Sequence, residues 1–402
     1  MEIIIQILLA LFYLLSGIVA FYLLLPAFLF IAYYLKGGLK KKFSFSTTAK
    51  QFEFAAIITA HQDWRFVAPF VDSFLKQRYK HFKVYVVADD CDTTELHFDD
   101  ERIIVLKPEV ALHSKIKSIQ YAIDNFVNDP DVMIIFDSDN LVHPNYLLNL
   151  TSYYQQGFKV VQTHMLSKNI DTTYSRLDSV GHIYYTFFER KSKMALGLSS
   201  SILGLGISLD YNLYKEINYK DTVGGFDKKL QAKMAMLVRQ IAFADDAIVY
   251  DEKVEEAAVM EKQRTRWIWS YFSHMKESWQ LTWYGFKTMN VGRILLGATM
   301  LRPPMILLMS LLFALMLVSI LIKPLLLWYW AGIVVIYVLV FILTIATQSY
   351  QKGMLQSLRF IPLLVISQFK SLLKIKKAKK NFLKTEHKKV IYIDELLKHE
   401  GS

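Results

Sequence analysis

The 402-residue sequence has a single cysteine, Cys91, and neither an internal repeat nor a low-complexity stretch. One cysteine excludes an intrachain disulfide and fits a reducing compartment. Residues 3–35 also lack any charged side chain, and only Pro26 and isolated polar residues interrupt this apolar run. The run exceeds the ~20 residues that a membrane helix needs. It therefore predicts one tilted or kinked membrane helix, with the kink at Pro26.

Two more uncharged, apolar segments occur late in the chain, at residues 305–322 and 325–347. Lys323-Pro324 separates them, which leaves room only for a tight hairpin turn. Basic residues follow the first apolar run and flank the outer ends of the hairpin. By the positive-inside rule, this pattern places the middle of the chain and the C-terminal tail in the cytoplasm.

The net charge is +11, but much of the positive excess lies next to apolar segments. This placement favours anionic lipid head groups as partners and gives no reason to expect nucleic acid. The lysines concerned are Lys40, Lys41, Lys42, Lys374, Lys376, Lys377, Lys379 and Lys380.

The middle of the chain alternates short β-branched runs with segments of helical periodicity. The predicted strands are residues 54–59, 84–88, 103–106 and 132–136. Apolar residues recur at helical spacing between the first two strands and between the last two. This alternation predicts an α/β domain with a mainly parallel sheet.

Polar residues follow three of these strands, where ligands of such sheets collect. Asp137 and Asp139 come directly after the fourth strand. Two carboxylates one residue apart can hold Mg²⁺ or Mn²⁺, which usually also contacts substrate phosphates. A lone Asp-x-Asp is more often a solvated loop, so the other motifs carry the interpretation. His61, His113, His164 and His182 show no metal-ligand spacing, which favours structural or surface roles for them.

The order of the motifs resembles that of membrane-integrated family 2 glycosyltransferases, the group that includes cellulose, chitin and hyaluronan synthases. The similarity covers the middle domain and extends to the membrane segments. Its most specific element is Gln263-Arg264-Thr265-Arg266-Trp267; the other elements are Thr59-Ala60-His61-Gln62-Asp63, Val86-Val87-Ala88-Asp89-Asp90, Ser114-Lys115 and Asp137-Ser138-Asp139.

The resemblance implies a GT-A fold, a nucleotide-diphosphate-sugar donor and inverting transfer. The favoured acceptor is a membrane-associated lipid or glycan, and the expected location is a bacterial inner membrane with the catalytic domain in the cytoplasm. The expected domains are 1–42, an N-terminal transmembrane helix with a basic flank; 45–262, the GT-A domain; 263–300, the Gln-x-x-Arg-Trp motif with interfacial helices; 301–350, a transmembrane hairpin; and 351–402, an amphipathic basic tail.

Matching motif positions implies donor-binding roles for several residues. Asp89 would read the nucleotide base, with Asp63 near the nucleoside and Lys115 near the donor. Asp139 would meet the metal together with Asp137, which also approaches the ribose and diphosphate. Asp63 and Asp89 could instead be turn or helix-cap residues, and Lys115 a solvated lysine at a helix start. The expected donor-binding set is Thr59, Asp63, Asp89, Lys115, Asp137, Gln263, Arg264 and Arg266.

The catalytic base is expected at Asp227. An inverting transfer needs a carboxylate to take the proton of the acceptor hydroxyl. The family usually supplies it from Thr-Glu-Asp, whereas this chain has Gly225-Phe226-Asp227. The usual second acid is therefore missing. A cap of the following helix is the rival role for Asp227, and Asp245 and Asp246 are weaker candidates because they precede a strand as turn acids would.

The Gln263–Trp267 motif has a physical role in this setting. Arginine forks match diphosphate oxygens, and a tryptophan face can stack against a sugar ring. Trp267 is thus a candidate acceptor contact, as are Gly204 and Gly206, which could let the backbone approach the acceptor. The same motif also begins an aromatic stripe typical of a membrane-surface helix.

Three functions remain open from the sequence. The first is a transferase that adds a sugar to a membrane lipid or lipid-linked glycan. The second is a processive synthase that extends an exopolysaccharide, although three spans without internal charge poorly suit a polar channel. The third is a non-catalytic membrane scaffold, which the presence of all the expected donor-side acids disfavours.

Overall fold

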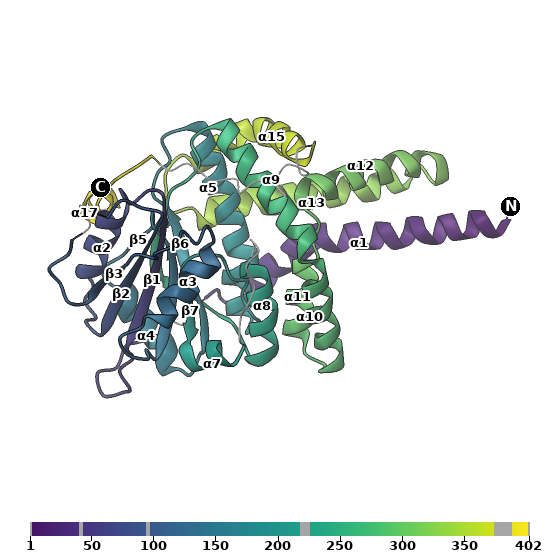
Figure 1. The fold of residues 1–402 in the computed structure, drawn as a ribbon. Helices are drawn as coiled ribbons and strands as arrows, with labels where there is room; N and C mark the ends of the chain where they lie inside the picture. The colour runs from purple at the N-terminus through teal and green to yellow at the C-terminus, as the bar shows by residue number, and fades with distance from the viewer. Residues whose placement is uncertain (1, 40–42, 94–96, 218–225, 374–387, 401–402) are drawn as a thin grey trace.

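The computed structural model describes residues 2–39, 43–93, 97–217, 226–373 and 388–400. The lysine clusters at 40–42 and 374–380, predicted to meet lipid head groups, lie outside these residues. One eight-stranded sheet forms the centre of the α/β domain, in the order β3-β2-β1-β4-β7-β6-β8-β5. Helices cover both of its faces, and three long helices project from one side (Figure 1).

The first half of the sheet is parallel. It consists of β1 (Phe54–His61), β2 (Phe82–Asp89), β3 (Ile103–Leu106) and β4 (Val132–Asp137). All four overlap the predicted strands. β1, β2 and β4 are apolar runs buried on both faces, whereas β3, the edge strand, is only partly buried. The parallel register brings the carboxyl ends of β1, β2 and β4 to one edge.

The second half of the sheet is mixed. It contains β5 (Leu141–Val142), β6 (Val160–Ser167), β7 (Ile207–Asp210) and β8 (Ala242–Asp251). β7 runs antiparallel to β4 and β6, whereas β6 and β8 are parallel with a register shift after Thr163. The predicted α/β class is confirmed, with antiparallel pairings in addition to the parallel ones. Asp245 and Asp246 lie within β8 and not in a turn before it, because the irregular pairing lets this strand continue through them.

Each face of the sheet packs against its own helices. α2 (Val67–Leu75) and α4 (Tyr146–Gln155) cover the face that carries Ala56 and Ile58. α3 (Lys115–Asp124), α7 (Tyr211–Glu216) and α8 (Phe226–Leu237) cover the face that carries Ile57 and Ile135. The two apolar layers hold the strand ends in fixed positions, so the side chains that follow them are preorganised.

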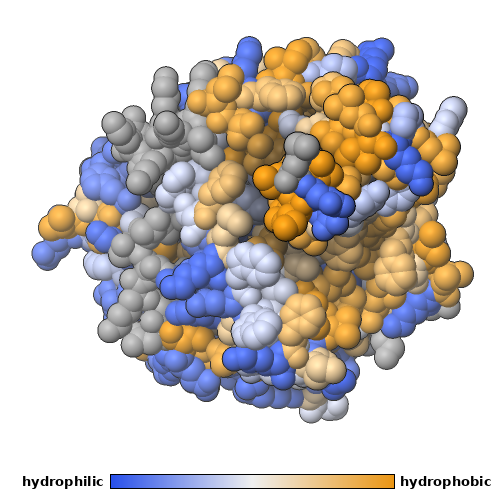
Figure 2. Space-filling model, turned by 90° about the vertical axis from the view of Figure 1, so that its right-hand side faces the viewer, coloured by the Kyte–Doolittle hydropathy of each residue, from blue (hydrophilic) through white to orange (hydrophobic). Residues whose placement is uncertain are grey.

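Three helices are long and apolar enough to cross a membrane: α1 (Glu2–Leu35), α12 (Met305–Ile322) and α13 (Leu326–Gln348). α1 is one helix that contains Pro26, and it packs against α12 and α13 through a shared apolar cluster. Viewed from the side where they project, hydrophobic side chains gather over the centre and right, and hydrophilic ones lie mainly at the left and rim (Figure 2). A membrane location is therefore consistent with the structure.

The remaining helices connect these two parts. α5 (Thr173–Thr186) begins at a capping box of Thr172 and Ser175 and continues into a π-helical turn, η1 (Phe187–Lys191), and α6 (Ser192–Ala195). The predicted aromatic stripe is divided between α9 (Ala257–Ser273) and α10 (Met275–Lys287), because the helix breaks at His274. The others are α11 (Val291–Met300), α14 (Met354–Ser357), η2 (Leu358–Phe360), α15 (Ile361–Leu373) and α17 (Ile393–Glu400).

Candidate active site

The expected donor-binding residues begin at the carboxyl ends of neighbouring strands. In the sheet register, Thr59 of β1 lies beside Asp137 of β4, and His61 of β1 lies beside Asp89 of β2. These pairs come together because the strands are parallel and end at the same edge. The structure thus gathers one group of polar side chains where ligands of α/β sheets bind.

Lys115 and Asp137 form the central contact of this group. The Lys115 Nζ atom donates to Asp137 Oδ1 at 2.5 Å and to the Gly204 carbonyl at 2.8 Å. Lys115 is the first residue of α3, and its ammonium also lies 5.7 Å from the Phe226 ring centroid. One lysine therefore joins the end of β4, the loop before β7 and the start of α8. Charge-assisted bonds of this kind fix a site better than neutral ones.

Asp139 lies deeper than Asp137. Asp139 is 4% exposed, and its carbonyl accepts a bond from Lys168 Nζ at 2.8 Å. The turn between the two acids is held by Asn140, whose Oδ1 accepts from the Asp137 amide at 3.0 Å. Two carboxylates on a rigid turn supply the hard oxygen ligands that Mg²⁺ and Mn²⁺ prefer, so these residues fit the predicted metal.

Asp89 is engaged by the protein itself. Its two carboxylate oxygens accept from the amides of Leu112 and His113, at 2.6 and 2.9 Å, and Oδ2 also lies 2.9 Å from His61 Nδ1. Asp89 is buried. Its hydrogen bonds to the two amides tie the segment before α3 to the end of β2. The ligand atoms of His61, Asp89 and His113 lie within 4.8 Å of one another, so this group could hold a metal ion. Sequence spacing gave no sign of it, because the three residues come from different strands and loops.

Asp63 lies at the rim of the group, in the segment after β1. Its carboxylate forms a two-point contact with Arg65, with Nε to Oδ1 at 2.9 Å and Nη2 to Oδ2 at 2.8 Å. Both side chains are partly open to solvent. Because Asp63 and Arg65 are only two residues apart, this ion pair fixes the loop that follows β1. Asp63 therefore stays close to the carboxyl end of that strand.

Asp227 and Arg266 reach the same region from two distant helices. Asp227 lies in the first turn of α8, and Arg266 lies in the middle of α9. Burial lowers the pKa of the Arg266 guanidinium, while the nearby carboxylates of Asp137 and Asp227 raise it. The Arg266 guanidinium therefore lies within electrostatic reach of the expected base and of one expected metal ligand.

Arg264 of the same motif has a different partner. Arg264 Nη2 pairs with Asp178 Oδ1 of α5 at 2.5 Å, and its guanidinium lies 4.1 Å from the Trp267 ring centroid. Trp267 is 46% exposed, and Gln263 is half-buried. Residues two apart on a helix point in different directions, so Arg264 and Arg266 cannot both face the acids. In this structure Arg264 joins α9 to α5.

Two buried glutamines, which the sequence analysis missed, shape the glycine-containing loop before β7. Gln162 Oε1 accepts from the Leu203 amide at 2.6 Å, and its Nε2 donates to the Leu205 carbonyl at 3.1 Å. Gln231 Oε1 of α8 accepts from the Ile202 amide at 2.7 Å. Their partners are backbone groups about 30 to 40 residues away, so no local pattern could reveal them.

Gly206 is required at its position. It has φ +61°, and a Cβ there would lie 2.6 Å from Thr163 Oγ1. We expect Gly206→Ala to lower the free energy of unfolding by about 2–4 kcal/mol, combining left-handed strain with overpacking. Gly197→Ala is a matched control, because Gly197 has φ +77° but nothing within 4 Å of its Cβ. Equal denaturation curves for the two variants would contradict the importance of the Thr163 contact.

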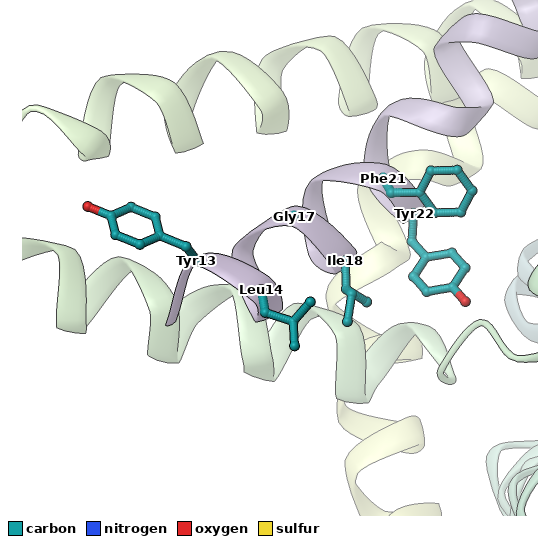
Figure 3. A pocket seen from close by; sticks show the side chains of 6 residues that line it. All are labelled: Tyr13, Leu14, Gly17, Ile18, Phe21 and Tyr22. Carbon is teal, nitrogen blue, oxygen red and sulfur yellow. The ribbon is translucent and has the colours of Figure 1, made fainter. Parts of the chain in front are cut away.

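Two grooves on the surface are apolar and lack the acids of the polar site. One is lined by Tyr13, Gly17, Phe21 and their neighbours on α1 (Figure 3). The second lies between α1 and α11 and includes Leu25 and Leu295. Because both are lined by membrane-helix or adjacent residues, we interpret them as surfaces for lipid hydrocarbon and not as part of the polar site.

Comparisons with known proteins identify the family and the fold. Residues 51–270 match the model of the family described as glycosyltransferase like family 2. No curated protein matches the chain. A mannosyltransferase from Pyrobaculum calidifontis, solved with GDP-Man and Mn²⁺, has a TM-score of 0.55 at 14% identity, over 92% of this chain and 100% of that chain. S. aureus TarS residues 1–349 with UDP-GlcNAc gives a TM-score of 0.42 at 14% identity, over 82% of this chain and 90% of that chain.

The family match covers the strands, the Asp-x-Asp turn, α8 and most of α9. It therefore includes Lys115, Asp137, Asp227 and Arg266, the residues that the structure gathers. The expected GT-A fold and the expected enzyme class are confirmed. This chain belongs to the family 2 glycosyltransferases.

Proposed function

We propose that this protein transfers a sugar, with inversion, from a nucleotide-diphosphate sugar to a membrane-associated lipid or glycan acceptor in cell-envelope glycan synthesis. The donor is a UDP-sugar, and the sugar is a hexose or an N-acetylhexosamine. The observation that supports the proposal is that the buried Arg266 guanidinium of α9 lies within electrostatic reach of two carboxylates, Asp137 of β4 and Asp227 of α8. A carboxylate base and a buried guanidinium that lie near each other suit a reaction that releases a proton and a nucleoside diphosphate.

Asp227 and Arg266 can supply the proton acceptor and the positive charge that the transfer requires. The acceptor hydroxyl oxygen attacks the anomeric carbon of the donor, and its proton passes to the Asp227 carboxylate. The bond from the anomeric carbon to the diphosphate oxygen breaks, and its electron pair stays on the leaving nucleoside diphosphate. Arg266 stabilises that charge, and its burial strengthens the interaction. Lys115 holds Asp137 in place and keeps positive charge near the donor.

A divalent cation, Mg²⁺ or Mn²⁺, fits the oxygen ligands of Asp137 and Asp139. When bound there it would neutralise charge on the donor diphosphate. Thr59, beside Asp137, and the loop with Gly204 and Gly206 then border the donor and acceptor sides of the site. Trp267 offers an exposed ring for the acceptor at the membrane side, next to the interfacial helix α10.

Sugar transfer to a lipid and processive polysaccharide synthesis differ in their acceptor. Among the described residues three helices could span a membrane, and α12 and α13 contain no charged residue. A self-contained polysaccharide channel needs several helices around a polar path, so a lipid or lipid-linked glycan is the favoured acceptor. The catalytic domain then faces the cytoplasm, below the inner leaflet of a bacterial inner membrane.

We expect full-length protein in lipid nanodiscs to release nucleotide from one member of a panel of UDP- and GDP-sugars. Release should stop on addition of a chelator and resume with excess Mn²⁺ or Mg²⁺. Radiolabelled product that extracts into organic solvent would support a lipid acceptor, whereas a water-soluble polymer would support the synthase. No release from any donor, with membranes present and metal supplied, would favour the scaffold.

A further inference from the structure

Arg190 is a buried arginine whose side chain lacks a hydrogen-bond acceptor. It belongs to the π-helical turn η1 and is 5% exposed. Its Nε atom is buried without a hydrogen-bond partner. Among the residues that the structure describes, Nη1 and Nη2 donate no hydrogen bond either, and no carboxylate lies within ion-pair distance of them. A guanidinium carries five donors, and each one that is buried without an acceptor costs free energy. Buried charged groups in proteins are normally paired with an opposite charge. A bound anion is therefore the expected partner of this guanidinium.

The backbone of η1 places Arg190 beside the loop that leads to Gly204. The Ser201 amide donates to the Glu189 carbonyl at 2.9 Å, and Ser200 Oγ donates to the Arg190 carbonyl at 3.2 Å. The next residue of this loop is held by Gln231 of α8. Gln231 lies one helical turn after Asp227, on the same face of α8. Arg190 therefore borders the side of the site that contains the proposed base.

Charges around Arg190 agree with this position. Burial lowers the pKa of the Arg190 guanidinium to about 10, while Glu189 and Asp227 raise it. Glu189 already has other partners: Lys193 and Arg302, each at 3.0 Å, and the Ser201 hydroxyl at 3.0 Å. Arg190 and Asp227 form no ion pair within 4.0 Å in the described structure. The guanidinium is thus close to acids without being neutralised by one.

We propose that Arg190 binds a phosphate group of a substrate on the Asp227 side of the site. This inference deepens the proposed transferase function and rests on it for the identity of the substrate. The planar fork of arginine matches two phosphate oxygens, and a phosphate would supply the acceptors that the folded chain does not. Because the anion enters only with the substrate, the unliganded enzyme carries the cost of the buried charge.

The phosphate has two candidate sources. One is the diphosphate of the donor, which the proposed function places near Arg266. The other is a phosphate on a lipid acceptor, since Phe187 and Phe188 of the same η1 turn pack against Leu29 and Tyr33 of the membrane helix α1. Both sources present the same chemistry to Arg190, so an experiment must separate them.

The test compares Arg190→Met and Arg190→Lys with wild type in full-length protein. Arg176→Met is the control, because Arg176 lies on the adjoining helix α5 and its Nε is bonded to the Ile170 carbonyl at 2.8 Å. Thermal unfolding is followed with and without inorganic pyrophosphate plus Mn²⁺. It is also followed in phosphatidylcholine nanodiscs that contain either phosphatidic acid or, as the phosphate-free match, diacylglycerol.

We expect wild type and Arg176→Met to be stabilised by pyrophosphate or by phosphatidic acid. Arg190→Met should bind that probe at least about tenfold more weakly, the loss of one charge-assisted contact. Arg190→Lys should fall between them, because it keeps the charge but loses the fork. Loss confined to pyrophosphate assigns the donor, and loss confined to phosphatidic acid assigns the acceptor.

Stability without probes separates binding from a structural role. Removing an unsatisfied buried charge should leave the Tm of Arg190→Met equal to or above that of wild type. Unchanged binding of both probes by Arg190→Met, or no stabilisation of wild type by either, would overturn the proposal. If Arg190→Met does not fold, unchanged binding by Arg190→Lys overturns it equally. A positive binding result without sugar transfer from any donor would leave the anion site standing while the proposed function fails.

Discussion

Asp227→Asn should reduce sugar transfer by about 10²–10⁴-fold, the usual contribution of a general base. The amide keeps the shape of the carboxylate but cannot take the proton of the acceptor hydroxyl. Donor binding should change little, since the residues that contact the diphosphate remain. The measurement is kcat for nucleotide release with saturating acceptor, together with the Kd of the nucleoside diphosphate.

The controls address the rival role of Asp227 as a helix-start acid. Removing an acid from the first turn of a helix costs only about 0.3–1 kcal/mol, so the Tm should fall slightly. Asp124→Asn, at the exposed end of α3, should leave transfer at the wild-type rate. Transfer by Asp227→Asn at the wild-type rate, with a Tm lowered as expected, would make Asp227 a structural residue and not the base.

Much of the first half of the sheet could be predicted from the sequence. Runs such as 54–59 and 132–136 are short, β-branched and buried on both faces, and this combination is specific for central parallel strands. The acids that follow them therefore had to lie at one edge. Asp137 and Lys115 could be expected in one site for that reason, although their 2.5 Å contact could not.

The rest depends on contacts between residues far apart in the chain. The antiparallel strand β7 gains its place only by pairing with both β4 and β6. Gln162 and Gln231 act by bonding the backbone of a distant loop, and glutamine has no sequence signal for such a role. His61 and His113 come together only because Asp89 binds both the end of β1 and the segment before α3. Arg190 becomes notable only once its burial and lack of acceptors are known.

Among the described residues, two groups discussed above could hold a metal ion, and physical arguments favour one of them. Asp137 and Asp139 offer oxygen ligands only, as Mg²⁺ and Mn²⁺ prefer. In the other group, Asp89 already accepts from two backbone amides and lies against His61. A cation at Asp89 would compete with bonds that hold the fold together. We therefore expect metal binding to depend on Asp139 and not on His113.

Asp139→Asn should abolish most Mn²⁺ binding and reduce sugar transfer by about 10²–10³-fold, because charge on the leaving diphosphate is no longer neutralised. Mn²⁺ titration followed by electron paramagnetic resonance gives the affinity directly, without reference to activity. His113→Gln should bind Mn²⁺ as wild type does, since it removes a ligand only from the second group. The reverse pattern, with binding lost in His113→Gln and kept in Asp139→Asn, would move the metal to the end of β2. It would also assign Asp137 and Asp139 to the donor alone, where the ammonium of Lys115 already supplies positive charge.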